Sequence, residues 1–600
     1  MCGIAGHFCR EGNAAPLDLN LLAHRGPDAS GEWLSADSRF WLGNTRLAIL
    51  DLSFAGAQPM EDPATGNVLV VNGEIYNHLA LRGEMPGVEW RGTSDTETLL
   101  QAYAHWGPQL LVRLKGMFAF AIYDHARQEL FLARDRLGIK PLYLAGDPAG
   151  MRFASETKAL TDCGAQKITR ESIGAYLQWG CCPEDRLLFS QIKTLPAGHA
   201  MIVRQNGETE HWRYWPEGKA FVSSPKSAPQ KIRRLLETAV EEHLLSDVPV
   251  ASFLSGGIDS SIVTALAAQK LGRKLETFSV GFDSAEFDES AIARKIAQRY
   301  RTNHRELHLS EDEVLESVTE AVAHLDLPSV DAINTYIVSR AVARAGVKVA
   351  LSGLGGDELF GGYPSFRDVP RLQLLAKLPR FLRHFAGDRL ADLPNESNAI
   401  ALAQWRRRFF TDEMLCAAGL PNDSAPLPCP ARLPDDFARI SWAELTGYMR
   451  RMLLRDSDQM SMAVSLELRV PFLDHELVEY SLGLPSAEKK RYRGTKGLLL
   501  EACRDLLLPA VYERPKKGFA LPMQTWMNGP LASFVEEGLR EVVAREILPN
   551  EFVARARTQF CAGDLHWTRL WSIVVLGHFV RRRSAIAATA NENIAFHSFA

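Results

Sequence analysis

The sequence lacks features that would place the protein in a membrane, outside the cell or on nucleic acid. Its longest near-continuous apolar run, residues 571–580, is far shorter than the roughly 18–20 residues that a membrane helix needs. The first residues, MCGIAG, have neither the basic nor the apolar region of a secretory signal. A net charge of −4 over 600 residues provides no basic surface for nucleic acid or an anionic membrane. We therefore expect a cytoplasmic protein of several domains that binds small molecules, with 571–580 as a buried helix.

Several common site motifs are also absent. Nine cysteines are scattered without a CxxC pair, so neither a disulfide framework nor a zinc site is expected. The sequence has no GxxxxGK[ST] loop and no GxGxxG motif. It has instead SGGIDSS at residues 255–261, between the apolar run 248–254 and the helix-like stretch 262–270. A strand, a Gly-Gly turn and a helix start gather backbone N–H groups and the positive end of the helix dipole, which suits phosphate.

A candidate nucleophile stands at position two. Removal of Met1 would leave Cys2 with a free α-amine, whose ordinary pKa of roughly 7.7–8.0 lets it act as base for its own thiol. Short β-branched and aromatic segments follow at 39–50, 68–71, 118–123, 129–133 and 152–155, with a helical stretch at 96–105. This pattern predicts packed antiparallel sheets flanked by helices.

The pattern changes in the second part of the chain. Residues 205–228 are rich in Pro, Ser and Gly and are expected to form a linker, after which residues 230–245 have helical periodicity. Strand patterns at 275–282, 303–309 and 347–351 alternate with helical ones that begin at 287 and span 335–345. Such alternation predicts a doubly wound parallel sheet with its ligand at the carboxyl ends of the strands. SGGIDSS and the glycine-rich loop 352–363, which carries Asp357 and Glu358, both fall at such ends.

Six segments of the N-terminal part resemble the class II glutamine amidotransferase domain, an N-terminal-nucleophile (Ntn) αββα fold: HRGPD (24–28), RLAILD (46–51), VVNGEIYN (70–77), SDTE (94–97), GMFAFAIYD (116–124) and ARDRLGIKPLY (133–143). The resemblance implies that Cys2 attacks the side-chain amide of glutamine while Asn72 and Gly73 stabilise the oxyanion. It implies a glutamine-binding set of Arg46, Ile49, Asn72, Gly73, Glu74 and Asp95. The alternatives are that Asn72–Gly73 is a hairpin turn and that Arg46 is a surface charge at a strand end.

The second part resembles the synthetase domain of glutamine-dependent asparagine synthetase, an ATP pyrophosphatase. The resemblance rests on SGGIDSS, the 352–363 loop, RDSDQMSMA (455–463), ELRVPFLD (467–474) and GTK (494–496). It implies that Asp259 and Asp357 hold Mg²⁺ and that Lys496 is catalytic, neutralising charge as pyrophosphate leaves. The implied ATP-binding residues are Phe253, Leu254, Ser255, Gly256, Gly257, Asp259, Ser260, Ser261, Val280, Ser352 and Gly353.

The expected architecture is therefore α+β followed by α/β. A glutaminase domain at 2–204 and a linker at 205–228 precede an ATP-pyrophosphatase domain with a helical C-terminal part at 229–582, and residues 583–600 are expected to be a disordered tail. The segment 367–435 matches no motif. A homodimer is one possible assembly.

One position departs from the family pattern. Members that make asparagine usually carry Glu in SGEGxDE, where this chain has Leu354. Either Glu358 or Glu467 supplies the missing charge, or the acceptor is not aspartate. Aspartate remains the leading acceptor, giving asparagine, glutamate, AMP and pyrophosphate, with a sugar acid, peptide or secondary metabolite as the alternative. SGGIDSS argues against amidotransferases that feed sugar phosphates, and the intact site residues argue against a scaffold protein.

Overall fold

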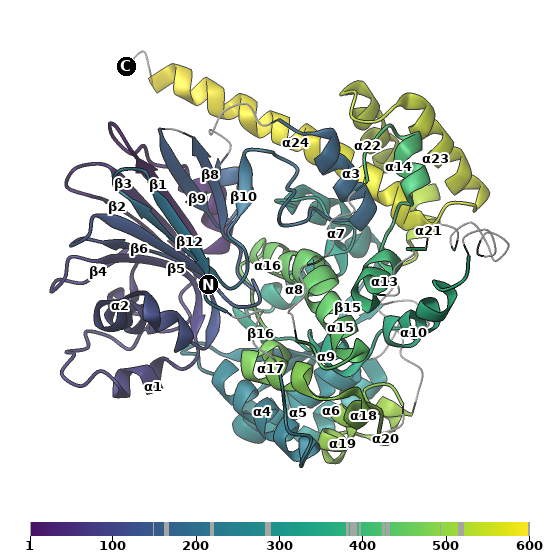
Figure 1. The fold of residues 1–600 in the computed structure, drawn as a ribbon, viewed down its shortest axis with the longest axis horizontal. Helices are drawn as coiled ribbons and strands as arrows, with labels where there is room; N and C mark the ends of the chain where they lie inside the picture. Colours follow the sequence, from purple (N-terminus) through teal and green to yellow (C-terminus); the bar gives the residue numbers. More distant parts are fainter. Residues whose placement is uncertain are drawn as a thin grey trace.

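The structure is a computed structural model that describes residues 2–147, 149–160, 167–215, 221–282, 290–379, 383, 390, 393–394, 398–422, 427, 432–491, 494–513 and 521–597. Two antiparallel six-stranded sheets form the N-terminal part, and a five-stranded parallel sheet lies in the second part (Figure 1). Helices surround the parallel sheet and continue into a helical C-terminal region. The predicted fold class is thereby confirmed.

The first sheet has the order β10-β8-β9-β1-β3-β2 and the second the order β12-β11-β7-β6-β5-β4. The strands of the first sheet are β1 (Cys2–Cys9), β2 (Ala29–Leu34), β3 (Phe40–Arg46), β8 (Tyr143–Asp147), β9 (Gly150–Ala154) and β10 (Ile192–Thr194). Those of the second sheet are β4 (Met60–Glu61), β5 (Val68–Ile75), β6 (Gly116–Asp124), β7 (Glu129–Arg134), β11 (His199–Arg204) and β12 (Thr209–Arg213).

Alternating side chains explain how these sheets stack. One buried cluster takes Ile4 and Phe8 from β1 and Val68 and Val70 from β5, so the two sheets face each other across it. The β5 side chains that point the other way, Leu69, Val71 and Ile75, pack on Leu99 of α2 (Asp95–Trp106), near α1 (His78–Gly83). On the outer side of the first sheet lies α3 (Arg170–Trp179) together with helices of the second part. The layers are therefore helix, sheet, sheet, helix.

The parallel sheet has the order β15-β14-β13-β16-β17, with every neighbouring pair parallel. Its strands are β13 (Val250–Phe253), β14 (Glu276–Phe282), β15 (Asn303–Leu309), β16 (Val349–Leu351) and β17 (Glu467–Arg469). One face packs on α4 (Ala228–His243), α5 (Ile258–Leu271) and α6 (Ser290–Tyr300), and the other on α8 (Ala332–Arg344). The start of the helix expected from residue 287 lies outside the described residues.

The remaining helices complete the second part and the C-terminal region. They are α7 (Glu311–His324), α9 (Gly356–Phe360), α10 (Ser365–Leu375), α13 (Ala399–Arg406), α14 (Asp412–Ala417), α15 (Asp436–Ala443), the π-helix η6 (Glu444–Leu454), α16 (Arg455–Met462), α17 (His475–Gly483), α18 (Ser486–Arg491), α19 (Gly497–Cys503), α20 (Pro509–Tyr512), α21 (Met523–Asn528), α22 (Ala532–Ala544), α23 (Asn550–Ala562) and α24 (Trp567–His597). Residues 571–580 lie in α24 and are largely buried, as predicted. Across the ranges described, no helix combines the length and apolarity needed to span a bilayer.

Two expected boundaries differ in the structure. The predicted linker 205–228 contains β12, which pairs with β11 across a turn at Asn206-Gly207, where Gly207 has φ +86°. An Asn-Gly pair favours a hairpin, and this explains why the sheet continues beyond residue 204. The predicted disordered tail is helical as far as His597, because residues 583–597 contain alanines and neither Pro nor Gly.

Candidate active site

Cys2 begins β1 at the boundary between the two parts of the molecule, where the N-terminus lies in Figure 1. Its side chain is 5% exposed, and its backbone N donates to Oδ1 of Asn72 at 3.3 Å. The amide of Gln58 donates to the Cys2 sulfur at 3.9 Å. The sequence-predicted nucleophile and oxyanion residue are therefore neighbours, although 70 positions separate them in the chain.

Asn72 and Gly73 lie inside β5 and do not form a hairpin turn. Nδ2 of Asn72 is buried and has no hydrogen-bond partner among the residues described. A buried amide N–H without a partner costs roughly 1–3 kcal/mol, which an incoming oxyanion would recover. Gly73 has φ +155°, and a Cβ there would lie 2.1 Å from the carbonyl oxygen of Met117, so only glycine fits this position.

Three buried carboxylates, Glu74, Asp95 and Glu467, lie close together near the N-terminus. Asp95 is in the first turn of α2 and accepts from the N–H of Ile75 at 2.8 Å. Burial, together with the charges of Glu467 and Asp95, raises the pKa of Glu74 well above its ordinary value. Burial also raises the pKa of Asp95. Arg469 lies 3.4 Å from Glu74. Since the three acids outnumber this guanidinium, the cluster can accept the positive charge of a substrate ammonium.

Arg46 is the last residue of β3 and lies directly opposite Cys2 where β3 pairs with β1. Its Nη1 donates to the carbonyl of Ser53 at 3.1 Å, and its Nη2 donates to the carbonyl of Asp51. The side chain is 8% exposed, so it is not the surface charge of the alternative interpretation. Nη1 has a second N–H that remains for a carboxylate. Ile49 is buried in the same loop, and its carbonyl accepts from the N–H of Asp247 at 3.0 Å.

The SGGIDSS turn connects β13 to α5, as the strand–turn–helix pattern predicted. Gly256 has φ +76°, which favours glycine. The hydroxyls of Ser255 and Ser260 lie 3.0 Å apart, and that of Ser261 donates to the carbonyl of Gly257 at 2.5 Å. These bonds hold the serines around the start of α5, where backbone N–H groups face an incoming anion.

Asp259, Asp357 and Lys496 come together from three separate segments. Nζ of Lys496 is 2.6 Å from Oδ1 of Asp357 and also contacts Oδ2 of Asp259. Burial lowers the pKa of Lys496, but the two carboxylates outweigh it and the pKa is raised. A Cβ on Gly356 would lie 2.3 Å from the Asp259 carboxylate, so the glycine lets the 352–363 loop approach the phosphate turn. Two carboxylates converging on one cation fit the donor set of Mg²⁺, which takes one or two carboxylates besides phosphate oxygens.

The other predicted ATP residues line the same edge of the parallel sheet. Phe253 and Val280 are half-buried on the neighbouring strands β13 and β14, and the N–H of Leu254 donates to the carbonyl of Phe278 at 2.8 Å. Ser352 follows β16, and a Cβ on Gly353 would lie 2.8 Å from the N of Ser260. Both loops therefore meet at one end of the sheet.

Neither acid considered as a substitute at position 354 supplies a free negative charge. Leu354 is half-buried against the main core of the second part. Burial and the charge of Asp357 raise the pKa of Glu358 to about 8, so it is mainly protonated near pH 7. Burial opposes ionisation of Glu467, but Arg469 lowers its pKa to about 2, and the two side chains are 2.5 Å apart. The charge of Glu467 is thus balanced by Arg469.

Arg25 and Asp458 are site residues whose connection sequence reasoning missed. Nε of Arg25 donates to the carbonyl of Cys2 at 3.3 Å, and Nη2 is 2.8 Å from Oδ2 of Asp458 in α16. Lys140 is buried 3.5 Å from the same carboxylate. Each of these residues lies in a motif that the sequence shows: HRGPD, RDSDQMSMA or ARDRLGIKPLY. The sequence does not show which of these distant motifs contact each other.

Arg469 makes a second connection between the two parts. It stands in β17, donates to the carbonyls of His243 at 2.8 Å and Leu245 at 2.6 Å, and reaches Glu74 of β5. Its own carbonyl accepts from the N–H of Ser352 at 2.8 Å. One residue therefore contacts both Glu74 of β5 and the start of the 352–363 loop.

The fold and the two sites define a class of protein that joins an Ntn-type glutaminase sandwich to a parallel sheet with a Ser/Gly phosphate turn. Residues 231–581 match the family model of asparagine synthase, and residues 1–215 match that of a glutamine amidotransferase domain. The chain belongs to the asparagine synthase family. As a member, it is a glutamine-dependent amidotransferase of the asparagine synthase type, and ATP is a substrate of that family.

The similar curated proteins have more than one kind of name. A putative glutamine-hydrolysing asparagine synthetase of Mycobacterium tuberculosis is 33% identical over 96% of each chain. Asparagine synthetase 1 of Bacillus subtilis is 30% identical over 96% of each chain. The amidase chyE of Penicillium rubens is 29% identical over 91% of this chain and 92% of its own. Similarity of this degree thus extends to an amidase as well as to asparagine synthetases.

Proposed function

We propose that Cys2 releases ammonia from glutamine and that the second site captures it in an amide of an ATP-activated carboxylic acid. The observation that carries the first half is the buried Asn72 Nδ2, which has no partner among the described residues and lies beside Cys2. Arg46 supplies an N–H for the α-carboxylate of glutamine, and the acids Glu74 and Asp95 accept its α-ammonium. Ile49 closes the side of this pocket.

The first reaction follows from these positions. With Met1 removed, the α-amine of Cys2 takes the thiol proton, and the thiolate attacks the amide carbon of glutamine. Asn72 Nδ2 and the Gly73 N–H stabilise the oxyanion. The amine returns the proton to the leaving nitrogen, so ammonia departs and a thioester remains. Water then hydrolyses the thioester, releasing glutamate and restoring the thiol.

The second reaction uses the edge of the parallel sheet. The acceptor carboxylate attacks the α-phosphorus of ATP and expels pyrophosphate, whose charge Lys496 and the N–H groups of residues 255–261 offset. Asp259 and Asp357 would hold Mg²⁺, which supplies charge neutralisation on the phosphates when bound. Phe253, Leu254 and Val280 flank the adenine, while Ser352 and Gly353 contact the adenosine. Ammonia then displaces AMP from the acyl carbon. A passage between the two sites that excludes water keeps ammonia from being protonated to ammonium.

Aspartate is the first acceptor to test, because asparagine synthetases are among the proteins similar to this chain. Leu354 favours a second candidate, a different carboxylic acid, since leucine accepts no proton and bonds no ammonium. We propose a cytoplasmic location and leave a homodimer as the alternative to a monomer.

The test measures which products ATP gives. Incubation with glutamine, Mg²⁺ and each member of a panel of carboxylic acids that begins with aspartate should release AMP and pyrophosphate in equal amounts with at least one acid. Formation of ADP and phosphate would refute cleavage at the α-phosphorus. Repeating the panel with Leu354→Glu should raise kcat/KM for aspartate if position 354 selects the acceptor.

A further inference from the structure

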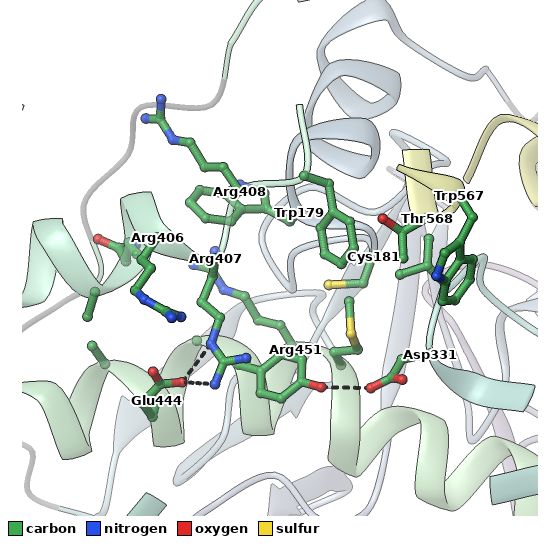
Figure 2. A pocket seen from close by; sticks show the side chains of 18 residues that line it. Trp179, Cys181, Asp331, Arg406, Arg407, Arg408, Glu444, Arg451, Trp567 and Thr568 are labelled. Atoms are coloured by element: carbon green, nitrogen blue, oxygen red, sulfur yellow. Dashed lines mark hydrogen bonds and ion pairs between the residues drawn. The ribbon is translucent and has the colours of Figure 1, made fainter. Parts of the chain in front are cut away.

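A cavity of about 330 Å³ lies next to the second site, between the π-helix η6, the end of α13 and the start of α24 (Figure 2). Two indoles line it: Trp179 at the end of α3 and Trp567 at the start of α24. Both indoles are half-buried. Cavities of ~300–1,000 Å³ hold ligands of drug size, which are far larger than aspartate.

The cavity lining is linked to the 352–363 loop through two side-chain contacts. Tyr448 of its lining lies 6.0 Å from the ring of Tyr363, edge to face. The Tyr363 hydroxyl donates to Oε1 of Glu358 at 2.7 Å. Glu358 directly follows Asp357, which contacts Lys496. Tyr448 in the cavity lining is therefore linked to the loop at Asp357 through Tyr363 and Glu358.

Most of the charged groups in the lining are already paired. Arg407 is 2.7 Å from Glu444 and stacks over the Tyr448 ring at 4.0 Å. The Tyr448 hydroxyl donates to Asp331 at 2.7 Å. Dashed lines in Figure 2 mark this hydrogen bond and the Arg407–Glu444 ion pair. Arg406 pairs with Asp368, and Arg408 with Asp412.

Arg451 is the exception in the lining. It makes no hydrogen bond or ion pair with any residue that the structure describes, and it is half-buried. A guanidinium in this position can bind an anion or donate to a hydrogen-bond acceptor of a ligand. The cavity thus offers two indole walls and one guanidinium that no described residue hydrogen-bonds. The Glu184 carboxylate is near enough that, against the effect of burial, this charge helps Arg134 to lower its pKa.

We propose that the acceptor is an aromatic carboxylic acid with a second acidic or hydrogen-bond-accepting group. Its ring lies against Trp179 and Trp567, its second group meets Arg451, and its reacting carboxylate extends past Tyr363 towards Lys496. Aromatic rings stack on indoles in offset or edge-to-face geometry, which selects planar acids. This inference rests on the proposed function and names the substrate class of its second site. The bonds formed and broken are those of the second reaction above.

Matched acids test the substrate class by pyrophosphate release with glutamine and ATP. Phthalate is compared with succinate, and phenylacetate with acetate, with aspartate as reference. We expect kcat/KM to be at least tenfold higher for the aromatic member of each pair, and phthalate to exceed phenylacetate. A preference for aspartate or succinate would overturn the aromatic class while leaving the proposed function intact. Absence of pyrophosphate with every acid, in a protein that still hydrolyses glutamine, would overturn both.

Variants test the lining. Trp567→Leu should raise KM for the aromatic acid about tenfold without changing KM for ATP, and Trp567→Phe should retain most of the affinity because it keeps a ring. Arg451→Met should abolish the advantage of phthalate over phenylacetate. Trp106→Ala and Arg545→Met, which alter a half-buried indole and a paired surface arginine far from the cavity, are the controls. Equal KM values for Trp567→Leu and the unmodified protein would contradict the placement of the ring.

Discussion

The guanidinium of Arg25 joins Cys2, the proposed nucleophile, to the second part of the molecule, because it donates to the Cys2 carbonyl and lies 2.8 Å from Asp458. Arg25 is fully buried, and Asp458 is 5% exposed. Burial disfavours the charged guanidinium, but Asp458 and Glu156 outweigh it and raise the pKa of Arg25. The residue that holds Cys2 therefore depends on a carboxylate from α16.

Asp458→Asn tests the cost of breaking this buried pair. Removing Asp458 should destabilise the protein by about 3–5 kcal/mol, because the buried cations Arg25 and Lys140 lose the carboxylate that they share and only Glu156, 2.9 Å from Arg25, remains beside that guanidinium. The matched control is Asp505→Asn, which breaks the exposed pair with Arg233 at 2.9 Å and should cost ~0–1 kcal/mol. Denaturant unfolding measures both, and equal small effects would show that the buried pair is not structural.

Asn72→Ala tests the oxyanion donor. It should lower kcat for glutamine hydrolysis by about 10²–10³ with little change in KM, because the lost N–H acts mainly in the transition state. Synthesis from added ammonia should remain unchanged. Asn20→Ala, on an exposed position, is the control. A variant whose kcat stays within twofold of the unmodified protein would exclude Asn72 from this role.

Lys496→Met tests the trio at the phosphate turn. We expect pyrophosphate release to fall by at least about 100-fold, since a charge next to the leaving group stabilises the transition state. Glutamine hydrolysis without ATP should be unaffected. Lys270→Met, which breaks the surface pair with Glu241 at 2.7 Å, is the control. Unchanged pyrophosphate release in Lys496→Met would argue that the lysine only balances Asp259 and Asp357.

Lys489 gives a prediction for pH. It is 6% exposed, and burial lowers its pKa to about 7, with Asp435 opposing the shift. An unfolded lysine titrates near about 10.4, so between these values the unfolded state binds more protons and stability rises with pH. Lys489→Met should therefore be more stable than the unmodified protein at pH 6.

That advantage should shrink above pH 7 by up to about 1.4 kcal/mol per pH unit. Unfolding midpoints at pH 6, 7, 8 and 9 measure it, with the exposed Lys490→Met as control. A difference that does not depend on pH would mean that Lys489 stays charged in the folded protein.

Local patterns in the sequence were enough to predict the strand–turn–helix at 250–271. The proximity of Cys2 and Asn72 was expected only from the family resemblance, since the Asn-Gly pair by itself favours a hairpin turn. Patterns were not enough for β17, because a three-residue strand has too few positions to show a period. The contact of Arg469 with Glu74 joins residues almost 400 positions apart, and no periodicity reports such a pairing. The cavity beside Tyr448 was missed for the same reason, since its walls come from five separate segments of the chain.

The most direct test of two cooperating sites in one chain is Cys2→Ala, assayed in parallel for glutamine hydrolysis and for ammonia-dependent pyrophosphate release. We expect glutamine hydrolysis to be lost, while ammonia still supports amide and pyrophosphate formation at the rate of the unmodified protein. Glutamine hydrolysis that persists in Cys2→Ala would contradict this expectation.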